Sequence, residues 1–344
     1  MFLSRRHLLR FLATGTASTA LTVAALRVAA AAATTSSLVV PATNAAADTA
    51  MTVLHAGSMN NLVQQGLAPA TQRDLGLKVL DVAGNSVFLA NSIKDGSKTG
   101  DLFMSADAGT NALLTGDANG DWVRWFAVFA RNSVVIGYSP KSRFAADFAA
   151  AQAGTKPWYE VLAQPGVKLM RNDPNLDPLG YYALFVCQLA ETYYGVPGLK
   201  QQVLGADTNP QQVGSAGAAM LASVEIDAAF LYLNGAADAN AAYLTLPDAI
   251  SLSNPDYADS YASASYTTPT GQTFQGAPIR FSIAPLTRAA QPDAAEQFLE
   301  YLLSPAGQAI ATAYHFLPSP ILLGGNTDAA PDAVKALAQG TYTG

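Results

Sequence analysis

The sequence contains a single cysteine, Cys187, among its 344 residues. One thiol cannot form an internal disulfide, and it cannot supply the Cys-rich ligand set of a structural zinc site. The chain is long enough to bury a sizeable core without such links, and 50% of its residues are hydrophobic. Disulfide-stabilised small domains and disordered chains are therefore excluded, and the length favours two domains.

Basic charge is also scarce, because 19 Lys and Arg stand against 25 Asp and Glu and form no long basic run. Binding to the phosphates of nucleic acid needs a stripe of Lys and Arg, so we expect no nucleic-acid partner. Residues 48–344 carry 15 basic and 25 acidic side chains. An anion bound by this part of the chain must be held by local dipoles, because a long-range positive field is absent.

The common motifs of enzymes are missing. The sequence has no His-Glu-x-x-His, no Gly-x-Ser-x-Gly, no Gly-x-Gly-x-x-Gly and no complete phosphate loop. Only His55 and His315 remain after the first 47 residues, and neither lies in a metal-binding pattern. We therefore expect no enzymatic activity and no cofactor.

Residues 1–47 have the composition of an export signal. Arg5 and Arg6 precede a weakly hydrophobic, Ala-rich run, and small residues follow to Ala47. The paired arginines resemble the twin-arginine signal. The alternative is an uncleaved membrane anchor, since the apolar run is long enough to span a bilayer. No other stretch approaches 18 apolar residues, so we expect a soluble mature protein.

Short apolar strands alternate with helices from residue 51 onward. Strands are predicted at 51–56, 77–82, 101–105, 125–130, 133–138, 167–170, 226–233 and 279–283. Helices are predicted at 62–72, 87–94, 158–162, 178–194, 218–224, 293–303 and 305–315. This alternation predicts an α/β chain with a parallel sheet covered by helices.

Seven short motifs resemble, in order along the chain, those of one protein family. They lie at 54–58 (Leu-His-Ala-Gly-Ser), 84–87 (Gly-Asn-Ser-Val), 129–132, 175–181 (Asn-Leu-Asp-Pro-Leu-Gly-Tyr), 246–248, 254–259 and 298–304. The family is the extracellular molybdate/tungstate-binding proteins of ABC importers, in the tungstate-type branch. The resemblance extends from about residue 53 to about residue 320.

The resemblance implies a periplasmic-binding-protein type II fold, an α/β architecture with the ligand in a cleft between two lobes. Each lobe would hold a central mixed sheet, and two crossover strands near 130–131 and 277–279 would join them. Lobe one would comprise 50–130 and 277–344, and lobe two 131–276. The family implies a periplasmic or extracellular receptor that passes molybdate or tungstate to the permease of an ABC importer, and we expect a monomer.

Ser58 and Ser86 are candidate oxyanion ligands. Each follows a strand and a glycine and stands where a helix is expected to begin, so backbone N–H groups and the positive end of a helix dipole lie nearby. Their hydroxyl groups can donate hydrogen bonds to a tetraoxo dianion. Without the resemblance, each serine would read as an ordinary helix N-cap.

Asp177 and Glu225 are candidate carboxylate ligands. Asp177 precedes Pro178 at the start of the clearest predicted helix, so it could be a plain N-cap. A carboxylate repels a dianion, yet molybdenum and tungsten can expand from four ligands to six and accept a hard oxygen ligand. In the tungstate-type branch an aspartate and a glutamate have this role. Asp177 matches the aspartate, whereas the glutamate position holds Ala222. Glu225, three residues later, could substitute for it or could be a solvated surface residue.

Two other functions stay open at this stage. A receptor of the same fold could bind sulfate or another small anion, and sulfur cannot expand its coordination as molybdenum and tungsten do. A secreted enzyme is the third hypothesis, against which the missing motifs speak.

Overall fold

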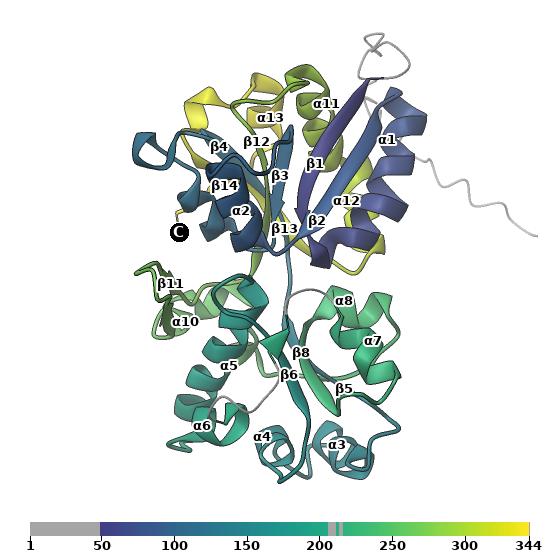
Figure 1. Ribbon diagram of the computed structural model, residues 1–344, viewed down its shortest axis with the longest axis vertical. Helices are drawn as coiled ribbons and strands as arrows, with labels where there is room; N and C mark the ends of the chain where they lie inside the picture. Colours follow the sequence, from purple (N-terminus) through teal and green to yellow (C-terminus); the bar gives the residue numbers. More distant parts are fainter. Residues whose placement is uncertain (1–48, 206–210, 213–215, 344) are drawn as a thin grey trace, which may run out of the picture. The chain divides into compact units, whose positions relative to one another are not determined.

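Two mixed β-sheets organise the residues that the structure describes, 49–205, 211–212 and 216–343 (Figure 1). The structure is a computed structural model, and its described residues fall in one compact unit. The predicted export segment at 1–47 lies outside the described residues. None of the described helices is both long and apolar enough to cross a membrane.

The larger sheet has seven strands in the order β14-β13-β4-β12-β3-β1-β2. Its strands are β1 (Ala50–Ala56), β2 (Lys78–Gly84), β3 (Leu102–Ser105), β4 (Trp125–Arg131), β12 (Arg280–Pro285), β13 (Leu317–Gly325) and β14 (Gly340–Thr341). Strands β2 and β3 both pair in parallel with β1. Strand β12 lies between β3 and β4 and is antiparallel to both. The sheet is therefore mixed rather than purely parallel.

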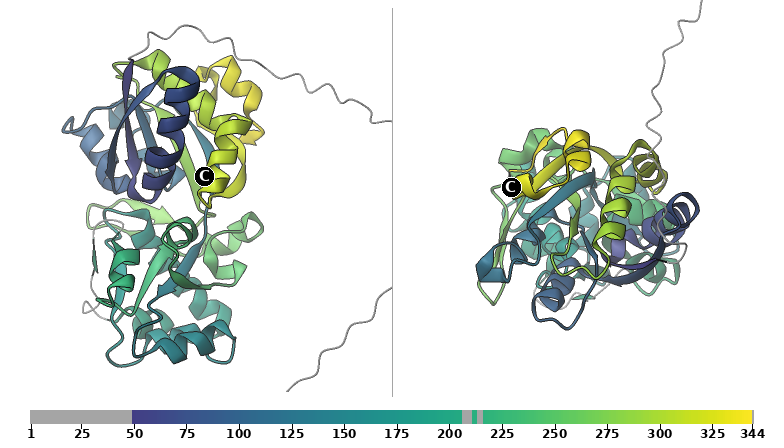
Figure 2. Two further views of the ribbon diagram at one scale, coloured as in Figure 1. Left: turned by 90° about the vertical axis from the view of Figure 1, so that its right-hand side faces the viewer. Right: turned by 90° about the horizontal axis from the view of Figure 1, so that it is seen from above.

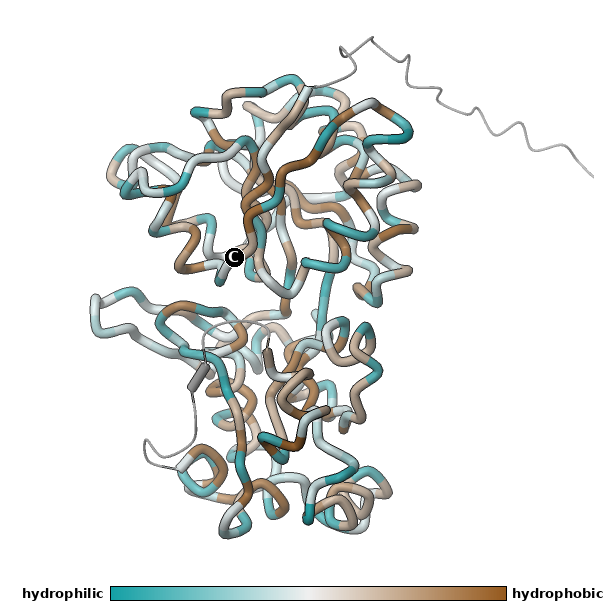
Figure 3. Tube along the Cα trace, turned by 45° about the vertical axis from the view of Figure 1, so that its right-hand side comes forward, coloured by the Kyte–Doolittle hydropathy of each residue, from teal (hydrophilic) through white to brown (hydrophobic). Residues whose placement is uncertain are grey.

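Helices cover both faces of the larger sheet. Successive strand residues point to opposite faces, and both sets are apolar, so each face needs a cover. Val53 and Met104 belong to one apolar cluster, whereas Leu54 and Phe103 belong to another. The helical segments of this part are η1 (Gly57–Met59), the π-helix η2 (Leu62–Leu67), α1 (Ala68–Leu75), α2 (Ser86–Lys94), η3 (Ala108–Leu113), η4 (Asp117–Asn119), α11 (Pro292–Leu303), α12 (Pro305–Ala313), η6 (Thr327–Ala329) and α13 (Asp332–Leu337). The central strands are largely hydrophobic, as the brown segments in Figure 3 show.

The smaller sheet has five strands in the order β7-β6-β8-β5-β9. Its strands are β5 (Val134–Tyr138), β6 (Leu169–Asn172), β7 (Gln211–Gln212), β8 (Ala228–Tyr232) and β9 (Ala242–Thr245). Strand β6 is parallel to β8, and β5 is antiparallel to β8 and β9. Both sheets are thus mixed, as the family resemblance implied.

The helical segments of the second part are α3 (Ala145–Gln152), α4 (Trp158–Leu162), α5 (Pro178–Tyr194), α6 (Leu199–Leu204), α7 (Gly217–Ala222), α8 (Leu233–Asp238), α9 (Asp248–Ser251), η5 (Pro255–Tyr257) and α10 (Ala258–Tyr261). Helices α3, α5, α7 and α8 pack on the smaller sheet, the other helices pack mainly against helices, and a hairpin follows them. Strands β10 (Ser265–Thr267) and β11 (Thr273–Gln275) form the antiparallel hairpin. The predicted strands and helices are found with small shifts of their ends. The sequence did not predict the helices α3, α6, α8, α9, α10 and α13 or the strands β7, β9, β13 and β14.

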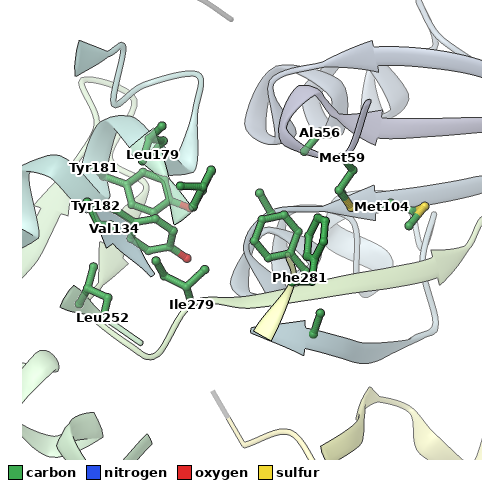
Figure 4. Packing of buried hydrophobic residues seen from close by; sticks show 14 of the residues in the cluster. Ala56, Met59, Met104, Val134, Leu179, Tyr181, Tyr182, Leu252, Ile279 and Phe281 are labelled. Atoms are coloured by element: carbon green, nitrogen blue, oxygen red, sulfur yellow. The ribbon is translucent and has the colours of Figure 1, made fainter. Parts of the chain in front are cut away.

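The chain passes from the larger sheet to the smaller one between Arg131 and Val134, and it returns at Arg280. These two segments run side by side, since Arg280 pairs with Arg131 in the β12–β4 ladder (Figure 2). The division into lobes at 131 and 277 stays a prediction. One apolar cluster continues through the junction, where Tyr181 and Tyr182 lie on one side of Phe281 and Met59 on the other (Figure 4).

Candidate functional site

A small cavity of about 80 Å³ lies between residues of the two sheets. A cavity of roughly 10–15 Å³, measured in the same way, is enough for one water molecule. The volume here is several times larger, so the cavity can hold a small polyatomic ligand. The larger sheet contributes residues 56–58, 84–86 and Ala106. The smaller sheet and its helices contribute Met170, Asn172, Asp177, Leu179, Gly217, Ala218, Leu231, Tyr232 and Gly235. We call this cavity the pocket.

The starts of several helices meet at the pocket. Ser86 begins α2, Asp177 is the N-cap of α5, and Gly217 begins α7. Tyr232 is the N-cap of α8. The first backbone N–H groups of a helix lack partners within it, and the helix dipole places partial positive charge at that end. The pocket is therefore surrounded by donors that favour an anion.

Ser58 presents a hydroxyl group without a protein partner. It lies in the short helix η1 directly after β1, and its buried Oγ atom makes no hydrogen bond within the described protein. The Ser58 carbonyl accepts a hydrogen bond of 2.8 Å from the Asn234 amide in α8. Asn234 in turn accepts a bond of 2.7 Å from Asn132 at the junction of the sheets. This buried amide pair holds Ser58 against the second sheet.

Ser86 and Asn85 supply two further donors from the β2–α2 turn. The Ser86 Oγ atom accepts a hydrogen bond of 3.0 Å from the Ala106 N–H, so its own hydrogen is available for another acceptor. Asn85 is the N-cap of α2, but its side chain does not cap the helix, and its buried Nδ2 group has no partner. Gly84 allows the tight turn, because a Cβ atom there would lie 2.9 Å from Leu89.

Tyr232 is a fourth donor, at the end of β8. Its side chain is 4% exposed, and its hydroxyl group has no hydrogen-bond partner among the described residues. Burial raises the pKa of Tyr232 well above the ordinary value for tyrosine, so the phenol keeps its proton and can donate it in a hydrogen bond. Sequence reasoning placed Tyr232 in a buried strand and missed this role, as it missed Asn85.

Asp177 has both of its carboxylate oxygens engaged in hydrogen bonds. Oδ1 accepts from the Leu179 N–H at 2.9 Å, which is the N-cap bond, and Oδ2 accepts from Asn172 Nδ2 at 2.6 Å. Burial raises the pKa of Asp177 to about 6. The loop before α5 approaches the helix closely, since a Cβ atom on Gly180 would lie 2.5 Å from the Pro174 nitrogen. Asp177 therefore caps α5 and also lines the pocket.

Glu225 is not brought to the pocket. It is exposed and lies between α7 and β8, three residues before the first residue of β8. Tyr232, at the other end of β8, is the residue that reaches the pocket. The strand from Ala228 to Tyr232, which is about 13 Å of extended chain, lies between these two positions. Of the four candidate ligands, the structure thus gathers Ser58, Ser86 and Asp177 around the pocket and leaves Glu225 apart.

A buried hydrogen bond crosses between the two sheets near the pocket. The Tyr181 hydroxyl in α5 donates to Oδ2 of Asp107, which lies in the loop after β3. The other oxygen of Asp107 accepts from the Gly109 N–H at 2.8 Å. Burial raises the pKa of Asp107 above its usual range. This bond forms only when the two sheets are as close as they are here.

The pocket has an unusual charge pattern for an anion site. Among the lining residues that the structure describes, Asp177 carries the only charged side chain, and no Lys, Arg or His is present. Within the described residues no group of three or more His, Cys, Asp or Glu side chains is placed to hold a metal ion. The chemistry of the pocket is therefore mainly hydrogen-bond donation, with the Asp177 carboxylate and the unpaired Oδ1 atom of Asn172 as acceptors beside the donors.

A sequence profile described as bacterial extracellular solute-binding protein matches residues 51–317. The molybdate/tungstate-binding protein WtpA of Thermococcus kodakarensis is 29% identical over 325 residues, covering 85% of this chain and 88% of the relative. The residues matched by the profile include the pocket residues of both sheets.

Solved structures share the fold at low sequence identity. The periplasmic molybdate-binding protein of Azotobacter vinelandii has a TM-score of 0.57 and 18% identity, covering 78% of this chain and 99% of its own. The sulfate-binding protein SubI of Mycobacterium tuberculosis has a TM-score of 0.56 and 14% identity, covering 86% and 94%. The two likenesses confirm the two-lobed α/β fold and do not separate one anion from another.

The raised pKa of Asp177 predicts a stability effect in the protein without ligand. The native carboxyl takes up a proton near pH 6 and the unfolded one near pH 3.9, so this group stabilises the wild type as pH falls from about 6 to about 4. Asp177→Asn should therefore raise the free energy of unfolding at pH 7 by on the order of 2 kcal/mol, with no gain near pH 4. Asn caps a helix as well as Asp.

Urea unfolding of both proteins at pH 7 and pH 4 measures this difference. Asp332→Asn is the matched control, because it removes the same charge from a side chain that is fully exposed. Equal stability of Asp177→Asn and wild type at pH 7 would contradict the raised pKa of Asp177.

Proposed function

The chain belongs to the family of bacterial extracellular solute-binding proteins, and from this premise we propose that it binds molybdate or tungstate and delivers it to an ABC importer. The named relative WtpA is described as binding these two oxyanions. The proposal also depends on the chemistry of the pocket, which must distinguish them from other anions.

The observation that carries the proposal is the set of unsatisfied donors around the pocket. Ser58 Oγ, Asn85 Nδ2 and Tyr232 OH are buried without a protein partner. A buried polar group without a partner costs roughly 1–3 kcal/mol, so three such groups facing one cavity favour a ligand rich in acceptors. A tetraoxo anion offers acceptors in several directions, and the helix N-termini favour its charge.

Asp177 supports molybdate and tungstate over sulfate. With a pKa of about 6, Asp177 is mostly ionised at pH 7 and repels any dianion beside it. Molybdenum and tungsten can gain from the carboxylate as an added oxygen ligand, whereas sulfur cannot. The SubI structure shares the fold, so sulfate stays the alternative ligand. With Glu225 apart from the pocket, we propose that Asp177 is the single added carboxylate ligand.

Several finer features belong to the same proposal. We propose that residues 1–47 form a twin-arginine export signal and linker, and that the mature protein is a soluble monomer outside the cytoplasm. Lobe one is proposed to comprise 50–130 and 277–344, and lobe two 131–276. The membrane permease is the proposed partner, and no enzymatic turnover is part of this function.

A thermal-shift panel of molybdate, tungstate, sulfate, phosphate and chromate tests the ligand. A specific ligand at 100 times its dissociation constant adds about 2.7 kcal/mol to the free energy of unfolding, which is a clear shift. We expect shifts with molybdate and tungstate, and little or none with sulfate and phosphate. The absence of a shift with both molybdate and tungstate would refute the proposal, and a shift with sulfate alone would favour the alternative.

The two serines should differ when each is replaced by alanine. Each hydrogen bond to a charged group contributes about 1.5–3 kcal/mol, so Ser58→Ala and Ser86→Ala should each raise the molybdate dissociation constant at least tenfold. Ser58→Ala should leave the unliganded protein as stable as wild type, because its hydroxyl has no protein partner. Ser86→Ala should lose about 1–3 kcal/mol, because the Ala106 N–H loses its acceptor.

Calorimetry with molybdate and urea unfolding measure both quantities. Ser263→Ala is the control, because Ser263 is exposed and its hydroxyl bonds only the Ser260 carbonyl. Unchanged affinity in Ser58→Ala would mean that the pocket is not the binding site.

Asp177→Asn should change the affinities of different anions in opposite directions. Removing the negative charge relieves repulsion, so sulfate binding should stay weak or improve slightly. Molybdate and tungstate should bind less tightly if they lose an anionic oxygen ligand. Calorimetry with all three anions at one ionic strength gives the signs, and X-ray absorption at the tungsten edge gives the coordination number. Tighter tungstate binding in the variant would show that Asp177 acts only as a helix cap.

A further inference from the structure

Asn172 is a buried pocket residue with an unused hydrogen-bond acceptor. It is the last residue of β6 and lies on the same face of the strand as Met170, which also lines the pocket. Asn172 is 4% exposed, and its Oδ1 atom is buried without a hydrogen-bond partner among the described residues. Neither the fold nor the donors around the pocket account for this free oxygen.

A hydrogen bond to Asp177 determines which end of the Asn172 amide is free. Asn172 Nδ2 donates to Oδ2 of Asp177 at 2.6 Å. The reverse orientation would place two acceptor oxygens at this short distance, because a carboxylate only accepts. Nδ2 therefore stays with Asp177, and Oδ1 is left as the free end. Since Oδ1 and Nδ2 are bonded to the same carbon, the free oxygen also lies close to the Asp177 carboxylate.

The free oxygen of Asn172 differs in polarity from the other unpartnered groups of the pocket. Ser58 Oγ, Asn85 Nδ2 and Tyr232 OH can all donate, which suits the oxygens of an anion. An amide oxygen only accepts, so against the oxygens of a deprotonated anion it would set lone pairs against lone pairs. A further donor would serve a tetrahedral dianion better. The amide oxygen becomes favourable where it contacts an electron-poor central atom.

Molybdenum and tungsten offer such an atom, because they can expand from four ligands to six. Hard metal centres accept amide oxygens as well as carboxylates, and two oxygens bound to one centre are at most about 5 Å apart. The Asn172 oxygen is one amide group away from the Asp177 oxygen, which is compatible with this limit. The position expected for a second carboxylate holds Ala222, and Glu225 lies apart from the pocket.

We propose that Asn172 Oδ1 is the second added oxygen ligand of molybdate or tungstate, beside Asp177. An oxygen lone pair forms one dative bond to the central atom, and no bond breaks and no proton moves. A neutral amide completes six-fold coordination without a second negative charge in a pocket whose described lining residues include no Lys, Arg or His. The assignment rests on the proposed binding of molybdate or tungstate, and it identifies a residue that selects the central atom.

Two pocket asparagines with opposite free ends provide a matched pair of variants. Asn85 is 7% exposed and leaves a donor free, whereas Asn172 leaves an acceptor free. Asn172→Leu should raise the dissociation constant of tungstate at least tenfold and leave that of sulfate unchanged or lower, because sulfur gains nothing from the oxygen. Asn85→Leu should raise both dissociation constants by similar factors. Calorimetry with both anions measures them, and an unchanged ratio of the two constants in Asn172→Leu would overturn the assignment.

X-ray absorption at the tungsten edge counts the ligands directly. We expect six oxygen ligands in tungstate-saturated wild type and in Asn85→Leu, and five in Asn172→Leu. Fewer than six in the wild type would overturn the assignment, and this measurement does not depend on the folding of any variant. Six ligands in Asn172→Leu would overturn it as well.

Asn172→Asp separates the free oxygen from the hydrogen bond to Asp177. This variant loses the Nδ2 donor, as Asn172→Leu does, but it keeps an oxygen at the same place. It should therefore retain six ligands around tungsten, and the added charge should weaken sulfate binding further. Loss of one ligand in Asn172→Asp as well would mean that the amide only positions Asp177, which would overturn the assignment.

Failure of this inference and failure of the proposed function have different signatures. If the wild type binds neither molybdate nor tungstate, both are refuted. If Asn172→Leu binds tungstate as tightly as the wild type does, the function stands and the assigned ligand is wrong. Phosphate carries a proton at pH 7 that the Asn172 oxygen could accept. Phosphate binding that is lost in Asn172→Leu while tungstate binding is kept would overturn the assignment in favour of a proton-bearing anion.

Discussion

An anion in a pocket without a cationic side chain can be held only by donors and dipoles that are already aimed at it. This constraint explains the arrangement of both sheets around the pocket. Strands β1 and β2 of the larger sheet, and β6 and β8 of the smaller one, each end at the pocket and pass directly or through a short turn into a helical segment. Ligand sites in open α/β sheets lie beyond the carboxyl ends of strands for the same reason, since helix N-termini collect there.

The pocket exists only while the two sheets stay together, and a few buried polar contacts hold them. Asn132 and Asn234 connect the junction to the Ser58 carbonyl, and Tyr181 reaches Asp107 from the opposite sheet. Such buried bonds are costly to break without replacement, so they favour one relative position of the sheets. A ligand that accepts hydrogen bonds from the unpartnered donors would further stabilise this relative position of the sheets, because those donors come from both sheets.

The sequence was sufficient to indicate three candidate residues that line the pocket, because their positions follow from local structure. Ser58, Ser86 and Asp177 each stand where a strand or loop leads into a helix, and this pattern is visible in the chain. Asn85 and Tyr232 were missed because an N-cap asparagine and a strand-end tyrosine have common structural roles, and only the three-dimensional structure shows their side chains without partners. Strand β13 was missed because Pro318 and Pro320 interrupt its apolar pattern. The antiparallel place of β12 depends on contacts between distant segments.

Different groups around the pocket account for binding of an anion and for selection among anions. Donors and helix N-termini suit any tetrahedral dianion, so they explain affinity for the class and not the choice within it. Two carboxylates stand nearby, Asp177 in the wall and Asp107 behind Tyr181, and burial raises the pKa of both. Unfavourable charge of this kind discriminates, because it penalises every dianion that cannot use the carboxylate as a ligand.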